Sequence, residues 1–148
     1  MEDVERVDAF WTPFLRQALR DALVDGLSPD DLPEHSHWQW ERKWRFAAAG
    51  TRFFGIECEG ETQAMMSVRA DKIGRLPEQS GLPLLYVDYL AAAPWNLPEL
   101  VRRPRLRGSG LALLGAAVRL SRQIGYNGRI GLHSLPKAES FYRDKCGI

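Results

Sequence analysis

An apolar run at residues 84–93, stopped by Pro94, limits the possible folds of this chain more than any other segment. A strand that is apolar along most of its length belongs inside a sheet whose two faces are both covered. A helix pattern follows at residues 111–124, closed by Gly125, and residues 128–134 form the next strand pattern. Strand, helix and strand in this order predict a parallel pair of strands joined by a right-handed crossover.

Helix and hairpin patterns precede this unit. Apolar residues recur every three or four positions in residues 4–27, and Pro13 inside that pattern is expected to kink or divide the helix. The other expected elements are a helix at 38–46, strands at 51–58 and 63–68 joined by a turn at 59–61, a loop at 71–83 and a last short helix at 137–145. The prediction is a mixed α/β fold with one sheet flanked by helices. A length of 148 residues, 45% of them hydrophobic, suits a single domain over residues 1–148.

Composition and charge narrow the range of partners. A net charge of +1 gives no reason to expect nucleic acid, and no stretch is apolar enough to span a bilayer. The acidic, amphipathic N-terminus does not look like a secretory signal, and the two cysteines are expected to be reduced thiols. His35 and His37 lack a clear third ligand, so no metal is expected. The sequence predicts a cytoplasmic protein without a membrane partner.

A basic turn that contains glycines lies between the apolar strand and the following helix. Its notable residues are Arg105, Arg107, Gly108, Ser109 and Gly110. Glycines at alternate positions let the backbone curl tightly and approach a ligand closely. Free N–H groups of the turn and of the helix start form an anion site, and the two arginines can add charge-assisted hydrogen bonds. The turn therefore predicts a phosphate or pyrophosphate site.

This turn alone leaves other interpretations open. It lacks the Gly-Lys-Ser/Thr of a Walker A loop, and it lacks the third glycine and the distal acidic residue of a dinucleotide fingerprint. A single Gly-x-Gly before a helix is often only a structural turn. A functional interpretation therefore needs a second motif.

Two motifs follow one another in this part of the chain. Arg105-x-x-Gly108-x-Gly110 comes after a strand ending in Leu-Ala-x-x-Pro, and Ala138-x-x-Phe141-Tyr142-x-x-x-Cys146-Gly147-Ile148 lies downstream. The first resembles the Arg/Gln-x-x-Gly-x-Gly/Ala signature of the GNAT superfamily (GCN5-related N-acetyltransferases). The second is similar to that family's Ala-x-x-Phe/Leu-Tyr-x-x-x-Gly-Phe element. The resemblance covers residues 84–148 and implies a protein that binds acetyl-CoA and transfers its acetyl group to an amine. The alternative is a non-catalytic acetyl-CoA sensor that regulates a partner protein.

The resemblance implies how acetyl-CoA would be held. The pyrophosphate would lie near Arg105 on a turn formed by Arg107, Gly108, Ser109, Gly110 and Leu111. The pantetheine arm would pair like an added strand with Leu90, Ala91 and Ala92. Small side chains at residues 91–93 would leave room for this arm, although a tightly packed core strand is the alternative.

The resemblance also implies catalytic residues. Tyr142 matches the tyrosine that, in many family members, protonates the departing thiolate, and a phenol suits that role. A base must accept a proton from the amine. Asp88 is the first candidate because it shares a face with Leu90 if the strand is regular, but it could equally be a structural hydrogen-bond acceptor. Glu57 is the second candidate and His133 the third. The acceptor could be a small molecule (a metabolite, an antibiotic or a polyamine) or a protein amine.

The sequence departs from the family's pattern in three places. Leu135 stands where the family often has asparagine, and the long link at residues 95–104 could form a flap or part of the amine site. The chain also ends where the family continues into further strands, so C-terminal strands are expected to be missing or truncated. A homodimer that covers the unpaired sheet edge is expected. Trp38, Trp40 and Trp44 could line a substrate cleft, but aromatic residues at this spacing are more often part of a core.

Overall fold

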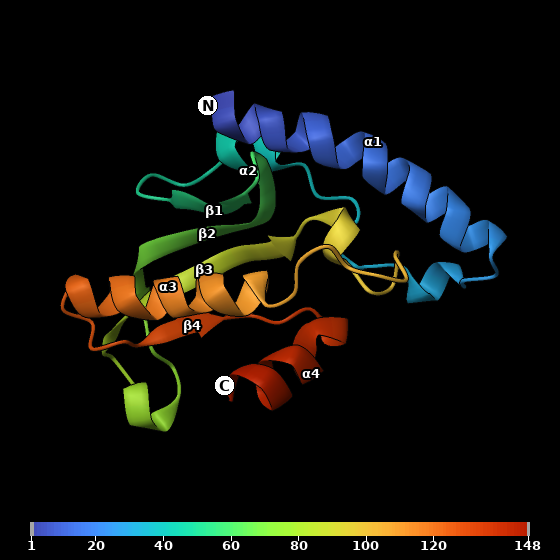
Figure 1. The fold of residues 1–148 in the computed structure, drawn as a ribbon. Helices are drawn as coiled ribbons and strands as arrows, with labels where there is room; N and C mark the ends of the chain where they lie inside the picture. Colours follow the sequence, from blue (N-terminus) through green and yellow to red (C-terminus); the bar gives the residue numbers. More distant parts are fainter. Residues whose placement is uncertain (1, 148) are drawn as a thin grey trace.

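The computed structural model describes residues 2–147, and these residues form one four-stranded sheet with the strand order β1-β2-β3-β4 (Figure 1). The strands are β1 (Arg52–Cys58), β2 (Glu61–Ile73), β3 (Pro83–Ala92) and β4 (Ile130–Leu132). β2 is antiparallel to both β1 and β3, whereas β3 and β4 are parallel. The predicted α/β class and the parallel crossover pair are confirmed.

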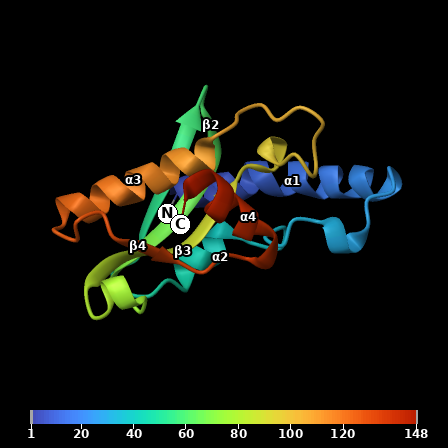
Figure 2. The same cartoon turned by 90° about the horizontal axis from the view of Figure 1, so that it is seen from below.

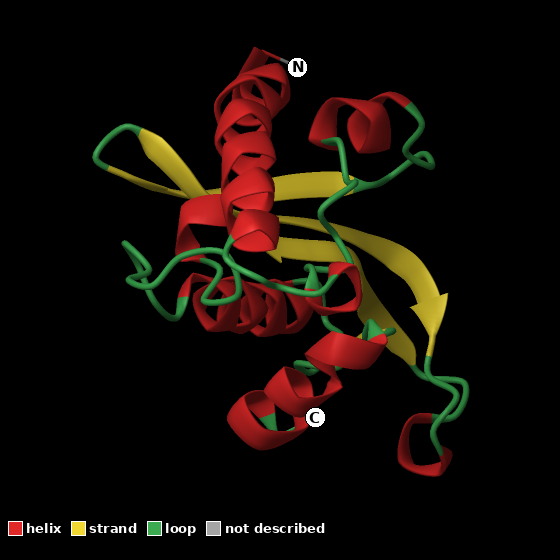
Figure 3. Cartoon of the chain, turned by 90° about the vertical axis from the view of Figure 1, so that its right-hand side faces the viewer, coloured by secondary structure: helices red, strands yellow, loops and turns green. Residues whose placement is uncertain are grey.

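Helices cover both faces of the sheet. They are α1 (Glu2–Val24), α2 (Trp40–Arg45), α3 (Ser109–Gln123) and α4 (Glu139–Phe141), and α4 continues into a π-helical turn at Tyr142–Cys146. Short 3-10 turns lie at Pro29–Asp31, Pro77–Gln79, Pro94–Asn96 and Pro136–Ala138. α1 and α2 lie on one face of the sheet and α3 on the other, while α4 lies near the β4 edge (Figures 1 and 3). No helix within residues 2–147 combines the length and the apolar character needed to cross a bilayer.

The long helix α1 runs through Pro13 without interruption, so the expectation that Pro13 could divide this helix is wrong. Val4, Val7 and Trp11 are buried along one side of α1. Their packing offsets the backbone hydrogen bond that proline removes. α1 ends at Val24, and the chain turns at Gly26, whose φ of +94° allows the Leu27 N–H to donate to the Ala22 carbonyl at 2.9 Å.

An aromatic core lies between the sheet and the layer of α1 and α2. Trp11 makes edge-to-face contacts with Trp40 and Trp95, with ring centroids 6.3 and 6.4 Å apart. Asp8 of α1 accepts a hydrogen bond from the Trp40 N–H at 2.9 Å and so fixes the start of α2. Trp40 is 1% exposed whereas Trp44 is 37% exposed, so the core prediction holds for Trp40 and not for Trp44.

An aliphatic core fills the opposite face, against α3. It is formed by Leu113, Leu114 and Ala117 of α3 with Met66, Val68, Leu85 and Val87 of β2 and β3. The alternation along β2 sends Met66 and Val68 to this face and Met65 and Ser67 to the α1 and α2 face.

The central strand β3 is irregular at Asp88. Val87 pairs with Val68 of β2 and Tyr89 pairs with Ser67, so Asp88 is an extra residue in the register. Val87 and Leu90 consequently pack on the α3 side, while Asp88 and Tyr89 both face α2. The expectation that Asp88 shares a face with Leu90 assumed a regular strand and is wrong.

Candidate functional site

Strands β3 and β4 diverge halfway along β3. The two strands pair only at Leu85–Val87 with Ile130–Leu132, and from Asp88 onward β3 pairs with β2 alone among the described residues. The Ala93 N–H donates to the Gln63 carbonyl of β2 at 2.9 Å. Because backbone groups alternate in direction along a strand, Leu90 and Ala92 turn their N–H and C=O groups toward the open edge. Ala91, also predicted to contact the pantetheine arm, turns its own backbone groups toward β2.

The start of α3 exposes backbone N–H groups of the predicted phosphate turn. Gly108 precedes the helix with a φ of +83°, and no side chain caps this end. The Ala112 N–H donates to the Gly108 carbonyl at 2.9 Å, which leaves the earlier N–H groups of Ser109, Gly110 and Leu111 without helical partners. A Cβ added at Gly108 would meet nothing within 4 Å. The helix start therefore has both the donors and the space that an anion needs.

The two sequence motifs meet in the structure. A Cβ added at Gly110 would lie 3.6 Å from the Phe141 ring, so the glycine turn and the last helix are neighbours. Phe141 and Tyr142 pack against the aliphatic core, as does Leu90 from the open half of β3. Figure 2 shows α4 beside the start of α3. Residues far apart in sequence thus gather around one end of β3.

Tyr142 has the protonation state that a general acid needs. Burial raises the pKa of its phenol, and the neighbouring Cys146 adds to the same effect. The phenol therefore keeps its proton at neutral pH, as the donor of a proton to a thiolate must.

Asp88, the first candidate base, forms an ion pair. Its two carboxylate oxygens accept hydrogen bonds from Nε and a terminal nitrogen of Arg69, each at 2.7 Å. This two-point contact across β2 and β3 is the stronger form of an Arg–carboxylate pair. This ion pair supports the structural interpretation of Asp88, in which its carboxylate is a hydrogen-bond acceptor and Arg69 is the donor.

The other two candidate bases lie in different places. Glu57 is exposed on the edge strand β1, and β2 separates it from β3. His133 directly follows β4, and its Nδ1 shares a hydrogen bond with the Tyr86 hydroxyl. Burial is the main cause of a raised pKa at Tyr86, so this hydroxyl is a phenol and not a phenolate. His133 is therefore near the point of divergence and Glu57 is not.

The two arginines of the turn have different surroundings. The Arg105 guanidinium pairs with Glu61 of the β1–β2 hairpin at 3.0 Å and lies over the Trp95 ring, 5.1 Å from its centroid. Arg107 is exposed. Arg105 thus contacts the hairpin, and Arg107 is the freer of the two to contact a phosphate.

The link before the turn begins inside the protein. Trp95 and Asn96 are buried, and both donate to the side chain of Gln63, at 3.0 and 2.8 Å. Asn96 also accepts a hydrogen bond from the Leu106 N–H at 2.8 Å. This part of the link anchors the predicted phosphate turn, so Trp95 and Asn96 are not part of a flap.

A hollow of about 690 Å³ lies on the α2 face. Of the three tryptophans named as possible cleft residues, Trp38 lines it, and Trp40 and Trp44 do not. Trp38 and Tyr89 line it with their rings 5.1 Å apart between centroids. Lys43 of α2 lies above both rings. The tryptophan pattern in the sequence pointed to Trp38, but it could not indicate Tyr89. Tyr89 faces Trp38 because of the register of β3.

Comparisons with known proteins give one consistent fold. No protein-family model matches the sequence, and no curated protein matches it. A GCN5-related N-acetyltransferase from Ralstonia eutropha JMP134 is 21% identical over 97% of this chain and 85% of that chain, with a TM-score of 0.53. A predicted acetyltransferase with acetyl-CoA from Clostridium acetobutylicum is 12% identical over 93% and 82%, with a TM-score of 0.51. The aminoglycoside N-acetyltransferase AAC(6′)-Iy in complex with CoA is 14% identical over 90% and 80%, also at 0.51. This chain has the fold of the GNAT acetyltransferases.

Proposed function

We propose that this chain is an N-acetyltransferase that binds acetyl-CoA where β3 and β4 diverge and transfers the acetyl group to an amine. The observation that carries the proposal is the position of the open half of β3 beside the uncapped start of α3. The likeness in fold to an acetyltransferase with acetyl-CoA and to one in complex with CoA supports it.

Backbone groups of the protein can bind both the pantetheine arm and the pyrophosphate of acetyl-CoA. Leu90 and Ala92 can pair with the amides of a pantetheine arm as an added strand would. The N–H groups of Ser109, Gly110 and Leu111 can bind the pyrophosphate, with Arg107 as a further cation. Arg105 would have to leave Glu61 to take part, so we assign the charge contact to Arg107.

The reaction balances with few protein groups. Acetyl-CoA supplies the thioester carbonyl, a neutral amine forms the new C–N bond, and the C–S bond breaks. The Tyr142 phenol gives its proton to the leaving thiolate and regains one from water. The proton lost by the amine passes to water, and we propose that Asp88 accepts it through that water. We do not retain Glu57 in this role, because β2 separates it from β3.

Calorimetric titration with acetyl-CoA tests the proposal, with CoA and ATP as comparators. We expect acetyl-CoA and CoA to bind and ATP to give no signal. Gly108→Ala is expected to weaken acetyl-CoA binding by about tenfold, because the new Cβ fills the space that the phosphate approaches.

Gly125→Ala is the matched control for this substitution. Gly125 lies at the other end of α3 with a φ of +84°, and an added Cβ there also meets nothing within 4 Å. Both substitutions should cost about 1 kcal/mol of stability through backbone strain. Absence of acetyl-CoA binding, or equal weakening by both substitutions, would contradict the proposed site.

A further inference from the structure

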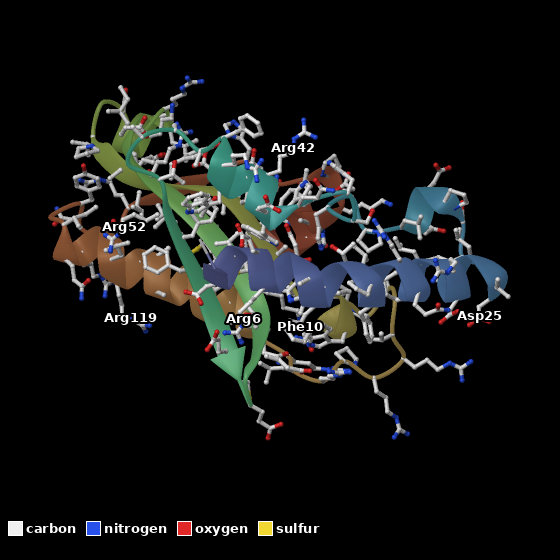
Figure 4. The ribbon with its side chains drawn as sticks, turned by 90° about the horizontal axis from the view of Figure 1, so that it is seen from above. Arg6, Phe10, Asp25, Arg42, Arg52 and Arg119 are labelled. Carbon is white, nitrogen blue, oxygen red and sulfur yellow. The ribbon has the colours of Figure 1, made fainter. Side chains whose placement is uncertain are left out.

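The hollow on the α2 face lies next to the open half of β3. Tyr89 lines the hollow, and its neighbour Leu90 turns its backbone groups to the open edge. The other walls come from α2, from the segments on both sides of it, and from β1 and β2. Figure 4 looks onto this side of the molecule and shows Arg42 reaching out from α2. A ligand in the hollow would therefore lie one residue along β3 from the proposed cofactor.

Charged side chains around the hollow are mainly cationic. Arg42, Lys43 and Arg69 line it together with the titratable His37, and Asp88 is the carboxylate among the described lining residues. Both oxygens of Asp88 are engaged by Arg69. Across residues 2–147, no described carboxylate lies within ion-pair distance of Arg42 or Lys43. The hollow thus carries positive charge that the protein does not neutralise.

Lys43 is partly withdrawn from water without an anionic partner. Its Nζ lies 3.3 Å from the Tyr89 ring centroid and 4.2 Å from that of Trp38. Burial lowers the pKa of Lys43 to about 8. The rings attract the charge, but an ammonium has three N–H donors, and a ligand oxygen is a better acceptor for them. An anionic group beside Lys43 would favour its charged form.

Ser67 provides a second polar group that lacks a partner. It lines the hollow from β2, has 0% exposure, and its Oγ makes no hydrogen bond to the described residues. Ser67 lies opposite Tyr89 in the register of β2 and β3. A buried hydroxyl without a partner is costly in a folded protein, and a ligand that bonds to it would remove this cost.

We propose that this hollow binds the acetyl acceptor and selects amines that also carry a carboxylate or phosphate group. The inference rests on the proposed acetyltransferase function and adds an acceptor class to it. The anionic group pairs with Lys43 and Arg42, the carbon skeleton packs on Trp38, and the amine points along β3 toward Leu90. Polycationic acceptors are disfavoured because Lys43 and Arg42 repel them.

Matched pairs of acceptors test the selection with the full chain. Tyrosine against tyramine isolates a carboxylate, and O-phosphoethanolamine against ethanolamine isolates a phosphate. In at least one pair, we expect kcat/KM to be about tenfold or more higher for the amine that carries the carboxylate or phosphate than for the amine that lacks it. Spermidine, a polycation, should be the poorest acceptor.

Variants on α2 locate the effect. Lys43→Met and Arg42→Met should each raise KM for the preferred anionic acceptor by about tenfold, with the Kd for acetyl-CoA unchanged. Arg45→Met is the control, because Arg45 is on the same helix, pairs with Glu41 and does not line the hollow. It should leave KM unchanged.

The dependence of KM on pH gives a separate readout. KM for the anionic acceptor should rise as the pH increases through about 8, because Lys43 loses its charge there. The charged and titratable groups Arg42, His37, Arg69 and Asp88 also line the hollow. Lys43→Arg keeps the charge at this position, so it should restore low KM and remove this part of the rise.

The outcomes separate the inference from the proposed function. The chain could bind and turn over acetyl-CoA but use amines with and without an anionic group equally well, or use spermidine best. Either result would overturn the inference and leave the proposed function in place. Lack of acetyl-CoA binding would overturn both.

Discussion

The two faces of β3 are built in different ways. Toward α3, Leu85 and Val87 pack in regular alternation against a helix that begins at a glycine turn. Toward α2, the extra residue Asp88 breaks that alternation and leaves Asp88 and Tyr89 on the same side. The first face adjoins the proposed cofactor site and the second the proposed acceptor site. A single bulge in one strand can thus place residues for two different sites on its two faces.

Removal of the proposed acid should have the largest effect. Tyr142→Phe is expected to lower kcat by roughly 10²- to 10⁴-fold while the Kd for acetyl-CoA stays the same. Tyr126→Phe is the control, because it loses only a hydrogen bond to the Ala70 carbonyl of 3.0 Å. Steady-state kinetics and calorimetry measure both. Unchanged turnover in Tyr142→Phe would favour a protein that binds acetyl-CoA without using this tyrosine.

The next largest effect concerns the core behind α2. Trp40→Ala should lower the free energy of unfolding by about 3–5 kcal/mol, because a buried aromatic side chain leaves a cavity. Trp44→Ala, at an exposed position of the same short helix, should cost about 1 kcal/mol or less. Denaturant unfolding compares the two. Similar losses would mean that Trp44 is also part of the core.

The bulge residue offers a sharper test of its role. Asp88→Asn should cost about 1–3 kcal/mol of stability, because Arg69 loses its charged partner. Asp71→Asn should cost less than about 1 kcal/mol, since Asp71 is exposed and 3.6 Å from the same guanidinium. Because Asp88 is also the proposed base, Asp88→Asn should lower kcat as well, which steady-state kinetics measures. A loss of stability with unchanged kcat would leave Asp88 with a structural role alone.

The smallest effect concerns the stability of the α2 face at different pH values. The pKa of Lys43 is about 8 in the folded chain, below its ordinary value of 10.5. Below pH 8 both states hold the proton and the burial cost is complete. Between pH 8 and about 10.5 the folded state releases the proton first, so stability should rise with pH. Lys43→Met should lack this rise when unfolding is measured from pH 7 to 10.

Regular patterns in the sequence predicted the regular parts of the fold. The apolar run before Pro94 and the periodic segment after Gly108 became β3 and α3 within two residues of their expected ends. β2 continues beyond Val68 to Ile73, because backbone pairing with β3 sustains a strand whose side chains are polar. The glycine turn and Tyr142 were also named from motifs that are local in sequence, and their roles stay predictions.

The features that the sequence did not predict depend on contacts between segments that lie far apart in the chain. The extra residue at Asp88 follows from the register of two strands, and the ion pair of Arg105 with Glu61 follows from the position of a distant hairpin. The hollow combines side chains from α2 and three strands. The predicted homodimer and the identity of the base stay predictions.

Mapping of backbone amide resonances by NMR during an acetyl-CoA titration tests the central claim most directly. We predict that the largest shifts occur at Leu90 and Ala92 of β3 and at Ser109, Gly110 and Leu111 of α3. Shifts confined to other parts of the chain, with these five amides unaffected at saturation, would contradict the proposed cofactor site.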